Sequence, residues 1–190
     1  MRWEPAIVMI FTMTRKLNLA FGLLIGLMWM GEVTFGNLGD TAVLGNFRTV
    51  HFHAYRLVVW SFIGGALLLT VFAGFFGAYQ TGSIQKGLSV GVWSGLISGA
   101  ITLATIMLVT VIFRDALLLA PSTVTEFARN GQSSPPGPTE LARVLYWDAF
   151  AGGANHMWIG PFLGVTFGGA GAAIGKRPHV TWLEYRASRS

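Results

Sequence analysis

Four long stretches with almost no charge constrain this chain more than any other feature. They cover residues 17–35, 57–79, 88–113 and 147–174, and Glu32 and Asp148 are the only charged residues in them. A helix of about 20 apolar residues crosses the roughly 30 Å hydrocarbon core of a bilayer. Each stretch meets that length. We therefore predict an all-α fold: an integral membrane bundle of four helices, forming a single polytopic domain over residues 1–190.

The composition supports the same class of protein. Charged residues make up 11% of the chain and hydrophobic residues 53%, whereas a soluble domain carries about 25% charged residues. The net charge is +5, and the basic residues gather beside the apolar stretches and in the termini. This pattern suits an anionic lipid surface, so we expect the lipid bilayer as a partner and no nucleic acid. The absence of cysteine excludes disulfides, thiolate metal sites and thiol catalysis.

The amino-terminal region resembles the charged start of a signal peptide. Thr14, Arg15 and Lys16 precede the first apolar stretch, but bulky Trp29 and Met30 stand where a small-residue cleavage site would be expected. We predict that the stretch is retained as the first span. The apolar segment 5–13 is too short to cross a bilayer, so it either lies at the interface or extends the first helix.

The distribution of Lys and Arg predicts the orientation, because cytoplasmic loops are enriched in both. With four spans, eight basic residues share the side of the termini and five lie on the other side: Arg2, Arg15, Lys16, Lys86, Lys176, Arg177, Arg186 and Arg189 against Arg48, Arg56, Arg114, Arg129 and Arg143. We therefore expect both termini, including a tail at 176–190, in the cytoplasm. The compact loops suggest a bacterial inner membrane.

The longest segment outside the spans covers residues 114–143. Thr123 and Glu126 match a capping box, Thr-x-x-Glu, which predicts a short interfacial helix before the last span. Proline at position 161 predicts a kink in that last span, because proline lacks a backbone donor.

Glycines recur at every fourth position in two of the stretches, a spacing that places them on one helix face. Such faces let helix backbones approach closely in lipid, as in a glycine zipper. We favour packing between the third and fourth spans, with a partner interface or a glycine-lined pore as alternatives. The helix-packing residues are Gly87, Gly91, Gly95 and Gly99 in the third span and Gly160, Gly164 and Gly168 in the fourth. The series in the fourth span begins at Gly152, has His156 in the missing place and is extended by Ala172.

Ionisable and polar residues within or beside the spans are the candidate functional positions, because burying them in lipid is costly. Under the predicted topology they gather in the outer half of the bundle: Glu32, Arg56, Arg114, Asp148, Asn155 and His156. We favour a structural role, in which Glu32 and Asp148 pair with Arg56 and Arg114 while Asn155 and His156 bond between helices. The alternative is an outward-facing cavity with His156 and Asp148 titrating.

A metal site has weaker support in the sequence. His51 and His53 alternate and could join Glu32 as ligands, but interfacial loop histidines are the simpler interpretation. The chain also lacks the phosphate-binding loop GxxxxGK[ST] and the hydrolase motifs HExxH and GxSxG.

Three functions are compatible with this pattern. The first is an accessory or assembly subunit of a membrane protein complex, without catalytic residues, cofactor or metal. The second is a small transporter or channel with an outward-facing polar cavity, acting alone or as a homo-oligomer. The third is an intramembrane enzyme or metal-binding redox protein that uses His51, His53 or His156. We favour the first, because the others need residues for which a structural role suffices.

Overall fold

The computed structural model describes residues 4–129 and 137–187, and these ranges are almost entirely helical and contain no strand. Short elements at one end are the 3-10 helix η1 (Ala42–Leu44), α2 (Phe47–Val50), α5 (Arg114–Leu118) and α6 (Pro121–Arg129). The long helices are α1 (Glu4–Leu38), α3 (Phe52–Thr81), α4 (Ile84–Ile112) and the continuous run of α7 (Pro138–Leu163), η2 (Gly164–Gly168) and α8 (Gly169–Ala187).

Four helices within the described ranges are long and apolar enough to cross a membrane. They cover Met13–Leu38, Phe52–Thr81, Ile84–Ile112 and Thr139–Pro178. The all-helical fold with four long apolar helices is therefore confirmed. Each predicted stretch lies within one of these helices, except that α4 ends at Ile112, one residue before the predicted end at 113.

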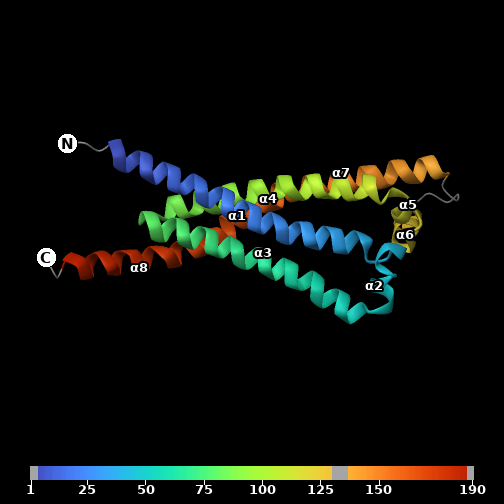
Figure 1. Ribbon diagram of the computed structural model, residues 1–190, viewed down its shortest axis with the longest axis horizontal. Helices are drawn as coiled ribbons and strands as arrows, with labels where there is room; N and C mark the ends of the chain where they lie inside the picture. The colour runs from blue at the N-terminus through green and yellow to red at the C-terminus, as the bar shows by residue number, and fades with distance from the viewer. Residues whose placement is uncertain (1–3, 130–136, 188–190) are drawn as a thin grey trace.

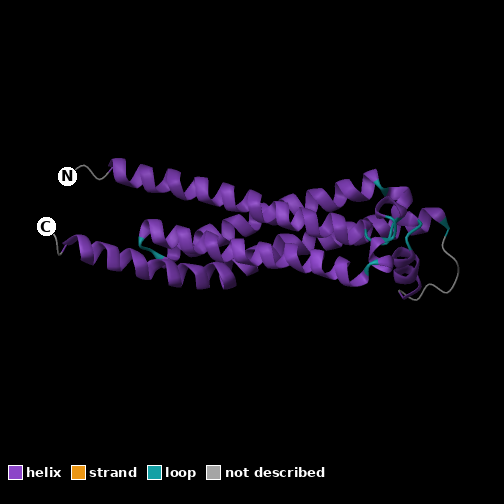
Figure 2. Cartoon of the chain, turned by 60° about the horizontal axis from the view of Figure 1, so that its bottom comes forward, coloured by secondary structure: helices purple, strands orange, loops and turns teal. Residues whose placement is uncertain are grey.

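Both chain ends lie at one end of the bundle, and α2, α5 and α6 lie at the other (Figure 1). We call these the terminal end and the loop end. The helix α1 starts at Glu4 without a break before the first span, so segment 5–13 extends the first helix. At the terminal end α1 and α8 project as separate arms past the turn that joins α3 to α4 (Figure 2).

Helix α4 is the central element and packs against α1, α3, α7 and α8. Its buried positions are mostly small or hydroxyl-bearing: Gly87, Val90, Gly91, Ser94, Gly95, Ser98, Gly99, Thr102, Ile106, Val109 and Thr110. The buried hydroxyls need partners in an apolar interior, and those of Ser98 and Thr102 donate to carbonyls one turn earlier in α4, at 2.9 and 2.8 Å. The core is thus built from closely approaching backbones.

The last membrane-length helix passes through Pro161 without ending. A wider π-helical turn, η2, follows the proline, and the Gly164 N–H donates to the carbonyls of Gly160 and Pro161. Such turns absorb an irregularity within an otherwise continuous helix. The expected local disturbance at Pro161 is therefore a change of helix type in the next turn.

The segment 114–143 differs from its predicted form in two respects. The short helix α6 is present, but it starts at Pro121, and the Thr123 hydroxyl donates to the Leu117 carbonyl at 2.7 Å. Thr123 is therefore not the N-cap, and the capping-box assignment was wrong. In addition, the helix that runs into the last span was expected to be capped at Thr139 but begins at Pro138, with Gly137 as its N-cap, and α8 continues as a helix to Ala187 within the predicted tail.

Candidate functional site

The two glycine faces predicted from the sequence lie against each other. A methyl group placed on Gly91 would lie 2.7 Å from the Gly164 carbonyl oxygen, and one on Gly99 would lie 2.6 Å from the His156 carbonyl oxygen. Gly95 and Gly160 make the same close approach between these pairs. No side chain larger than hydrogen fits at these positions without displacing backbone, so α4 and α7 are in direct main-chain contact.

The register of this contact changes at the π-helical turn. Gly91 lies beside Gly168 as well as Gly164, and Gly87 lies against Ala172, where a methyl on Gly87 would be 2.6 Å from the Ala172 Cβ. A π-turn adds one residue to a helical turn, which carries the small-residue face of α8 further along α4. Gly160, Gly164 and Gly168 therefore face α4, and Gly171 and Gly175 lie against Val71 and Phe75 of α3. A methyl group on Gly152 would meet no atom within 4 Å, so the predicted packing role of this first glycine of the series was wrong.

The opposite face of α7 carries exposed aromatic side chains. Trp147, Phe150, Trp158 and Phe162 fall on one side of a 3.6-residue helix, and all four are exposed. Trp158 is 80% exposed and lies between His156, which faces Gly99, and Gly160, which faces Gly95. Because Gly95 and Gly99 flank the midpoint of α4, Trp158 lies near mid-depth of the bundle.

An ion pair organises the connection between α1 and α3 at the loop end. The Arg48 guanidinium lies 3.5 Å from the Asp40 carboxylate, and the Thr49 hydroxyl donates to the same carboxylate at 3.0 Å. The Arg48 guanidinium also lies over the Tyr55 ring, 5.7 Å from its centroid. These contacts tie the α2 turn to the end of α1 and to the start of α3.

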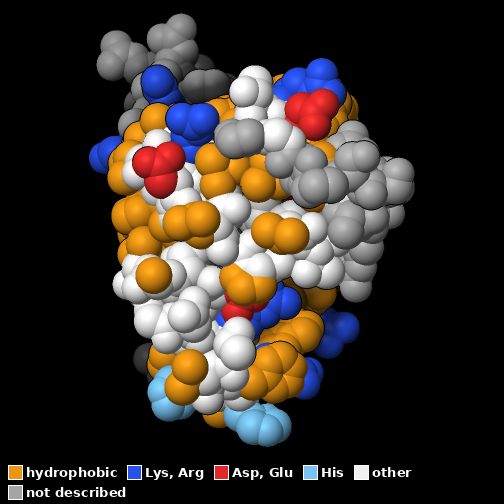
Figure 3. All heavy atoms as spheres, turned by 90° about the vertical axis from the view of Figure 1, so that its right-hand side faces the viewer, with side chains coloured by type: hydrophobic (Ala, Val, Ile, Leu, Met, Phe, Trp, Pro, Cys, Tyr) orange, Lys and Arg blue, Asp and Glu red, His pale blue; other side chains and the backbone are white. Residues whose placement is uncertain are grey.

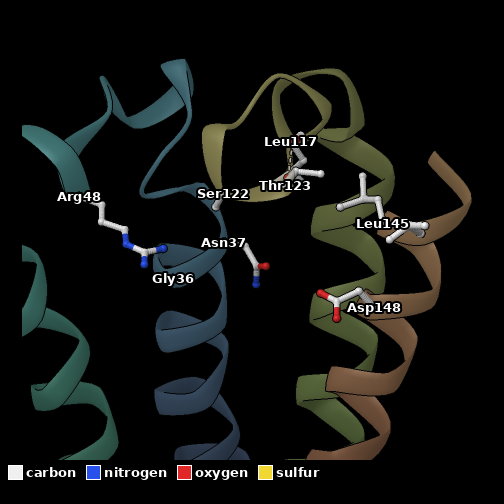
Figure 4. A pocket seen from close by; sticks show the side chains of 9 residues that line it. Gly36, Asn37, Arg48, Leu117, Ser122, Thr123, Leu145 and Asp148 are labelled. Carbon is white, nitrogen blue, oxygen red and sulfur yellow. Dashed lines mark hydrogen bonds between the residues drawn. The ribbon is translucent and has the colours of Figure 1, made fainter. Parts of the chain in front are cut away.

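A pocket of about 170 Å³ opens between these elements at the loop end. Figure 4 shows Arg48 on one side of the pocket, Asp148 of α7 on the other, and Asn37 of α1 between them. Ser122 and Thr123 of α6 cover it. The lining residues are Gly36, Asn37, Arg48, Leu117, Ser122, Thr123, Val144, Leu145 and Asp148.

The predicted polar residues do not form one cluster. Arg56 and Arg114 are exposed, and the Arg56 guanidinium lies over the Phe52 ring, 5.7 Å from its centroid. Within the described residues no ion pair joins Glu32 to Arg56; the pair at this end is Arg48–Asp40. Asp148 lines the pocket, and Arg114 does not. Among the described residues Glu32 therefore forms no ion pair with Arg56 or Arg114, and the predicted pairing of Asp148 stays a prediction. Figure 3 shows charged and histidine side chains distributed over this end.

Two of the predicted residues do come together. Glu32 and His156 are half-buried and near enough to interact electrostatically, and the His156 ring meets the Trp29 ring edge to face at 5.4 Å. The His156 Nδ1 is 2.9 Å from the Gly152 carbonyl oxygen of its own helix, so the predicted bond between helices was wrong for this residue. Asn155 is exposed.

The histidines of the 51–53 segment do not gather with acids. His51 and His53 are exposed, and the described residues contain no group of three or more His, Asp or Glu side chains placed to hold a metal ion. Among those residues, the geometry thus offers no support for His51, His53 and Glu32 as a metal site.

Arg48, Asp40 and Asn37 were not identified as candidate residues from the sequence. Asp40 and Arg48 meet because the chain reverses through Gly45 and Asn46, both at positive φ (60° and 55°). Gly and Asn tolerate this conformation, so the Gly45-Asn46 pair was the available signal for a tight reversal.

No protein-family model matches the chain, and neither the curated proteins nor the solved structures include a significant match.

Proposed function

We propose that the chain is a four-span integral membrane protein that acts as an accessory or assembly subunit of a membrane complex. Membrane insertion is supported by apolar side chains exposed on all four long helices, including Leu24, Leu68, Leu108 and Phe162. A soluble monomer rarely exposes contiguous apolar patches of more than a few hundred Å². In lipid, by contrast, these faces are solvated and helices associate through small residues. The facing glycines of α4 and α7 then act as a glycine zipper.

The charge at the terminal end supports a cytoplasmic location for both termini. Exposed basic side chains there are Arg15, Lys16, Lys86, Lys176 and Arg177. Basic residues near span ends are retained on the cytoplasmic side. The loop end then faces outward, which in a bacterial inner membrane is the periplasm.

The observation that carries the accessory role is the position of Trp158. Tryptophan in membrane proteins concentrates at the two interfaces, where its ring and N–H suit the headgroup region. Trp158 instead lies near mid-depth, points away from its own bundle and is 80% exposed. Lipid tails offer no partner for its indole N–H, whereas a protein surface does.

The neighbours of Trp158 favour a helix of another chain as its partner. Phe150 and Phe162 share its face of α7, and both are exposed. Large aromatic side chains dominate the energetics of protein interfaces. The exposed aromatic side chains of α7 form a row along one face of the helix, which a second helix could contact along its length. We assign the face of Trp147, Phe150, Trp158 and Phe162 to a transmembrane helix of a different protein.

Co-purification with matched variants tests this assignment. Tagged wild type, Trp158→Ala and Leu68→Ala are extracted in mild detergent from the native membrane, and associated chains are quantified. Leu68 is a suitable control because it is apolar, 56% exposed and on α3, away from the aromatic face. We expect a stoichiometric partner with wild type and Leu68→Ala and a loss of about tenfold or more with Trp158→Ala. Equal retention by both variants would remove the basis for the assignment, and a second copy as the bound chain would indicate a homo-oligomer.

The pocket at the loop end supports a second candidate, a small transporter. Glu32 and His156 lie deeper on the same helices as Asn37 and Asp148, so polar groups continue from the pocket into the bundle. Solute flux through the purified chain in reconstituted vesicles tests the transporter role directly. Flux of a solute above empty vesicles would favour transport, and its absence would favour the accessory role.

A further inference from the structure

A second pocket lies on the outer surface of α3, close to the start of that helix. It has a volume of about 320 Å³ and is lined by His53, Arg56, Leu57 and Trp60. The last three follow His53 by three, four and seven positions, a spacing that places all four on one helix face. Figure 1 shows α3 diverging from α1 toward the loop end, and Leu57 and Trp60 are 71% and 60% exposed. The pocket is therefore open to whatever surrounds the bundle.

The end of this pocket nearest the loop end carries a positive charge. The Arg56 guanidinium lies over the Phe52 ring, 5.7 Å from its centroid, and no carboxylate of a described residue lies within ion-pair distance of it. The described lining contains one arginine and no acid. A guanidinium has five N–H donors, and two of them match two oxygens of a phosphate. The His53 ring adds two nitrogens one turn away. A phosphate is therefore a group that this end of the pocket suits.

The same face of α3 becomes apolar toward the middle of the helix. Trp60, Gly64 and Leu68 follow at intervals of four residues, and Leu68 is 56% exposed. A methyl group on Gly64 would meet no atom within 4 Å, so the absent side chain leaves space between its two larger neighbours. The Ser61 hydroxyl beside them donates to the Leu57 carbonyl at 2.7 Å and is therefore satisfied within the helix. This part of the face suits a hydrocarbon chain.

The distance between the charged and apolar parts matches one leaflet of a bilayer. From Arg56 to Leu68 the helix rises about 18 Å at 1.5 Å per residue, and half of a hydrocarbon core is about 15 Å thick. In a four-span chain Arg56 then lies at the headgroups and Leu68 near the centre of the bilayer. A ligand that follows this face has an anion at the interface and a hydrocarbon chain below it, which is the arrangement of a phospholipid.

We propose that this face of α3 binds one anionic phospholipid, with its phosphate on Arg56 and His53 and an acyl chain along Trp60, Gly64 and Leu68. A choline or ethanolamine group would place a second cation beside Arg56, which favours a headgroup of net negative charge such as phosphatidylglycerol. The proposal rests on the membrane insertion in the proposed function, but it needs no protein partner. Thiol labelling from each side of the membrane tests insertion separately, so a chain that spans the membrane without selecting this lipid would refute the lipid site alone.

Titration of the purified, delipidated chain in mild detergent tests the proposal, with native mass spectrometry resolving each bound molecule. Four probes separate the parts of the ligand. Dioctanoyl phosphatidylglycerol carries the anion and the chains, dioctanoyl phosphatidylcholine adds a cation, dioctanoylglycerol lacks the phosphate, and inorganic phosphate lacks the chains. The test variants are Arg56→Gln, Arg56→Lys and Gly64→Leu. Their matched controls are Arg114→Gln, an exposed arginine outside this pocket, and Gly152→Leu on α7, where a methyl group would also meet no atom within 4 Å.

We expect phosphatidylglycerol to bind wild type and both controls equally, and more tightly than the other three probes. Arg56→Gln should bind it about fivefold more weakly, which is the contribution of one basic residue near an anionic lipid surface. Arg56→Lys keeps the charge and should lose less, which separates loss of recognition from loss of folding. Gly64→Leu should also weaken binding, because its side chain occupies the space for the acyl chain.

Binding of phosphatidylcholine or dioctanoylglycerol as tightly as phosphatidylglycerol would overturn the proposal, because the charge would then select nothing. Binding of inorganic phosphate with the same affinity would indicate a site for the free ion instead of a lipid. Equal losses in the control variants, unchanged affinity in Arg56→Gln, or no binding of phosphatidylglycerol to wild type would also overturn it.

Discussion

Gly91 of α4 and Gly164 of η2 meet main chain to main chain. A methyl group on Gly91 would lie 2.7 Å from the Gly164 carbonyl oxygen, and one on Gly164 would lie 2.7 Å from the Val92 Cα. In both cases the methyl group would clash with backbone atoms, which cannot rotate away as a flexible side chain can. The contact between these helices therefore depends on the absence of a single carbon atom at each position.

A methyl group on this face should weaken the bundle. Gly91→Ala forces α4 away from η2, and overpacking of this kind costs about 1–3 kcal/mol. Unfolding by sodium dodecyl sulfate in mixed micelles, followed by circular dichroism, measures the change in the free energy of unfolding.

Gly152→Ala is the matched control for that experiment. Gly152 lies on α7, and a methyl there would meet no atom within 4 Å. Alanine has the higher helix propensity, so we expect unchanged stability or a gain of up to about 1 kcal/mol. Equal destabilisation by Gly91→Ala and Gly152→Ala would show that the close contact is not what holds these helices together.

The Arg48–Asp40 pair should stabilise the loop end only modestly. Asp40→Asn removes the ion pair while keeping an acceptor for the Thr49 hydroxyl. Because the Arg48 side chain is 45% exposed and the Asp40 side chain 14% exposed, solvent screens the pair and the expected loss is about 0.5–1 kcal/mol. Hydrogen exchange read by mass spectrometry should become faster in residues 39–51 and stay unchanged in α4. Faster exchange in Asp115→Asn to the same degree would argue against a specific role for the pair.

The predicted topology can be tested with single cysteines, because the chain contains none. Gln85→Cys lies in the first turn of α4, beside the α3–α4 connection, and Ala42→Cys lies in η1; both positions are exposed. We expect a membrane-impermeant thiol reagent applied from outside to label Ala42→Cys and to leave Gln85→Cys unlabelled until the membrane is opened. The reverse pattern would invert the orientation, and labelling of both from outside would contradict the number of spans.

The sequence was sufficient to predict the four long helices but not the contacts between polar side chains. Apolar length predicts the four long helices, because it depends only on composition along the chain. Which way Arg56 or Asp148 points depends on the rotation of each helix about its axis, and a one-residue shift turns a side chain by about 100°. The Asp40–Arg48 contact likewise depends on the backbone angles of Gly45 and Asn46. Helix rotation and loop backbone angles are set by the tertiary structure, and the spacing of residues along the sequence does not determine them.

The boundaries of the last helix show the same limit. The glycines lower the apolar character at its centre, and the polar start of the helix resembles a loop in composition. In the structure Pro138 starts the helix at its first turn, where proline costs no hydrogen bond. Pro161 lies within the helix, which continues through the π-helical turn that follows it.

Native mass spectrometry of the chain, extracted gently from its own membrane, tests the proposed accessory role most directly. We expect one dominant species in which this 20.5 kDa chain is bound in fixed stoichiometry to a different membrane protein. That species should disappear in Trp158→Ala and persist in Leu68→Ala. A lone monomer, or an oligomer of this chain alone, in the wild-type preparation would contradict the accessory role.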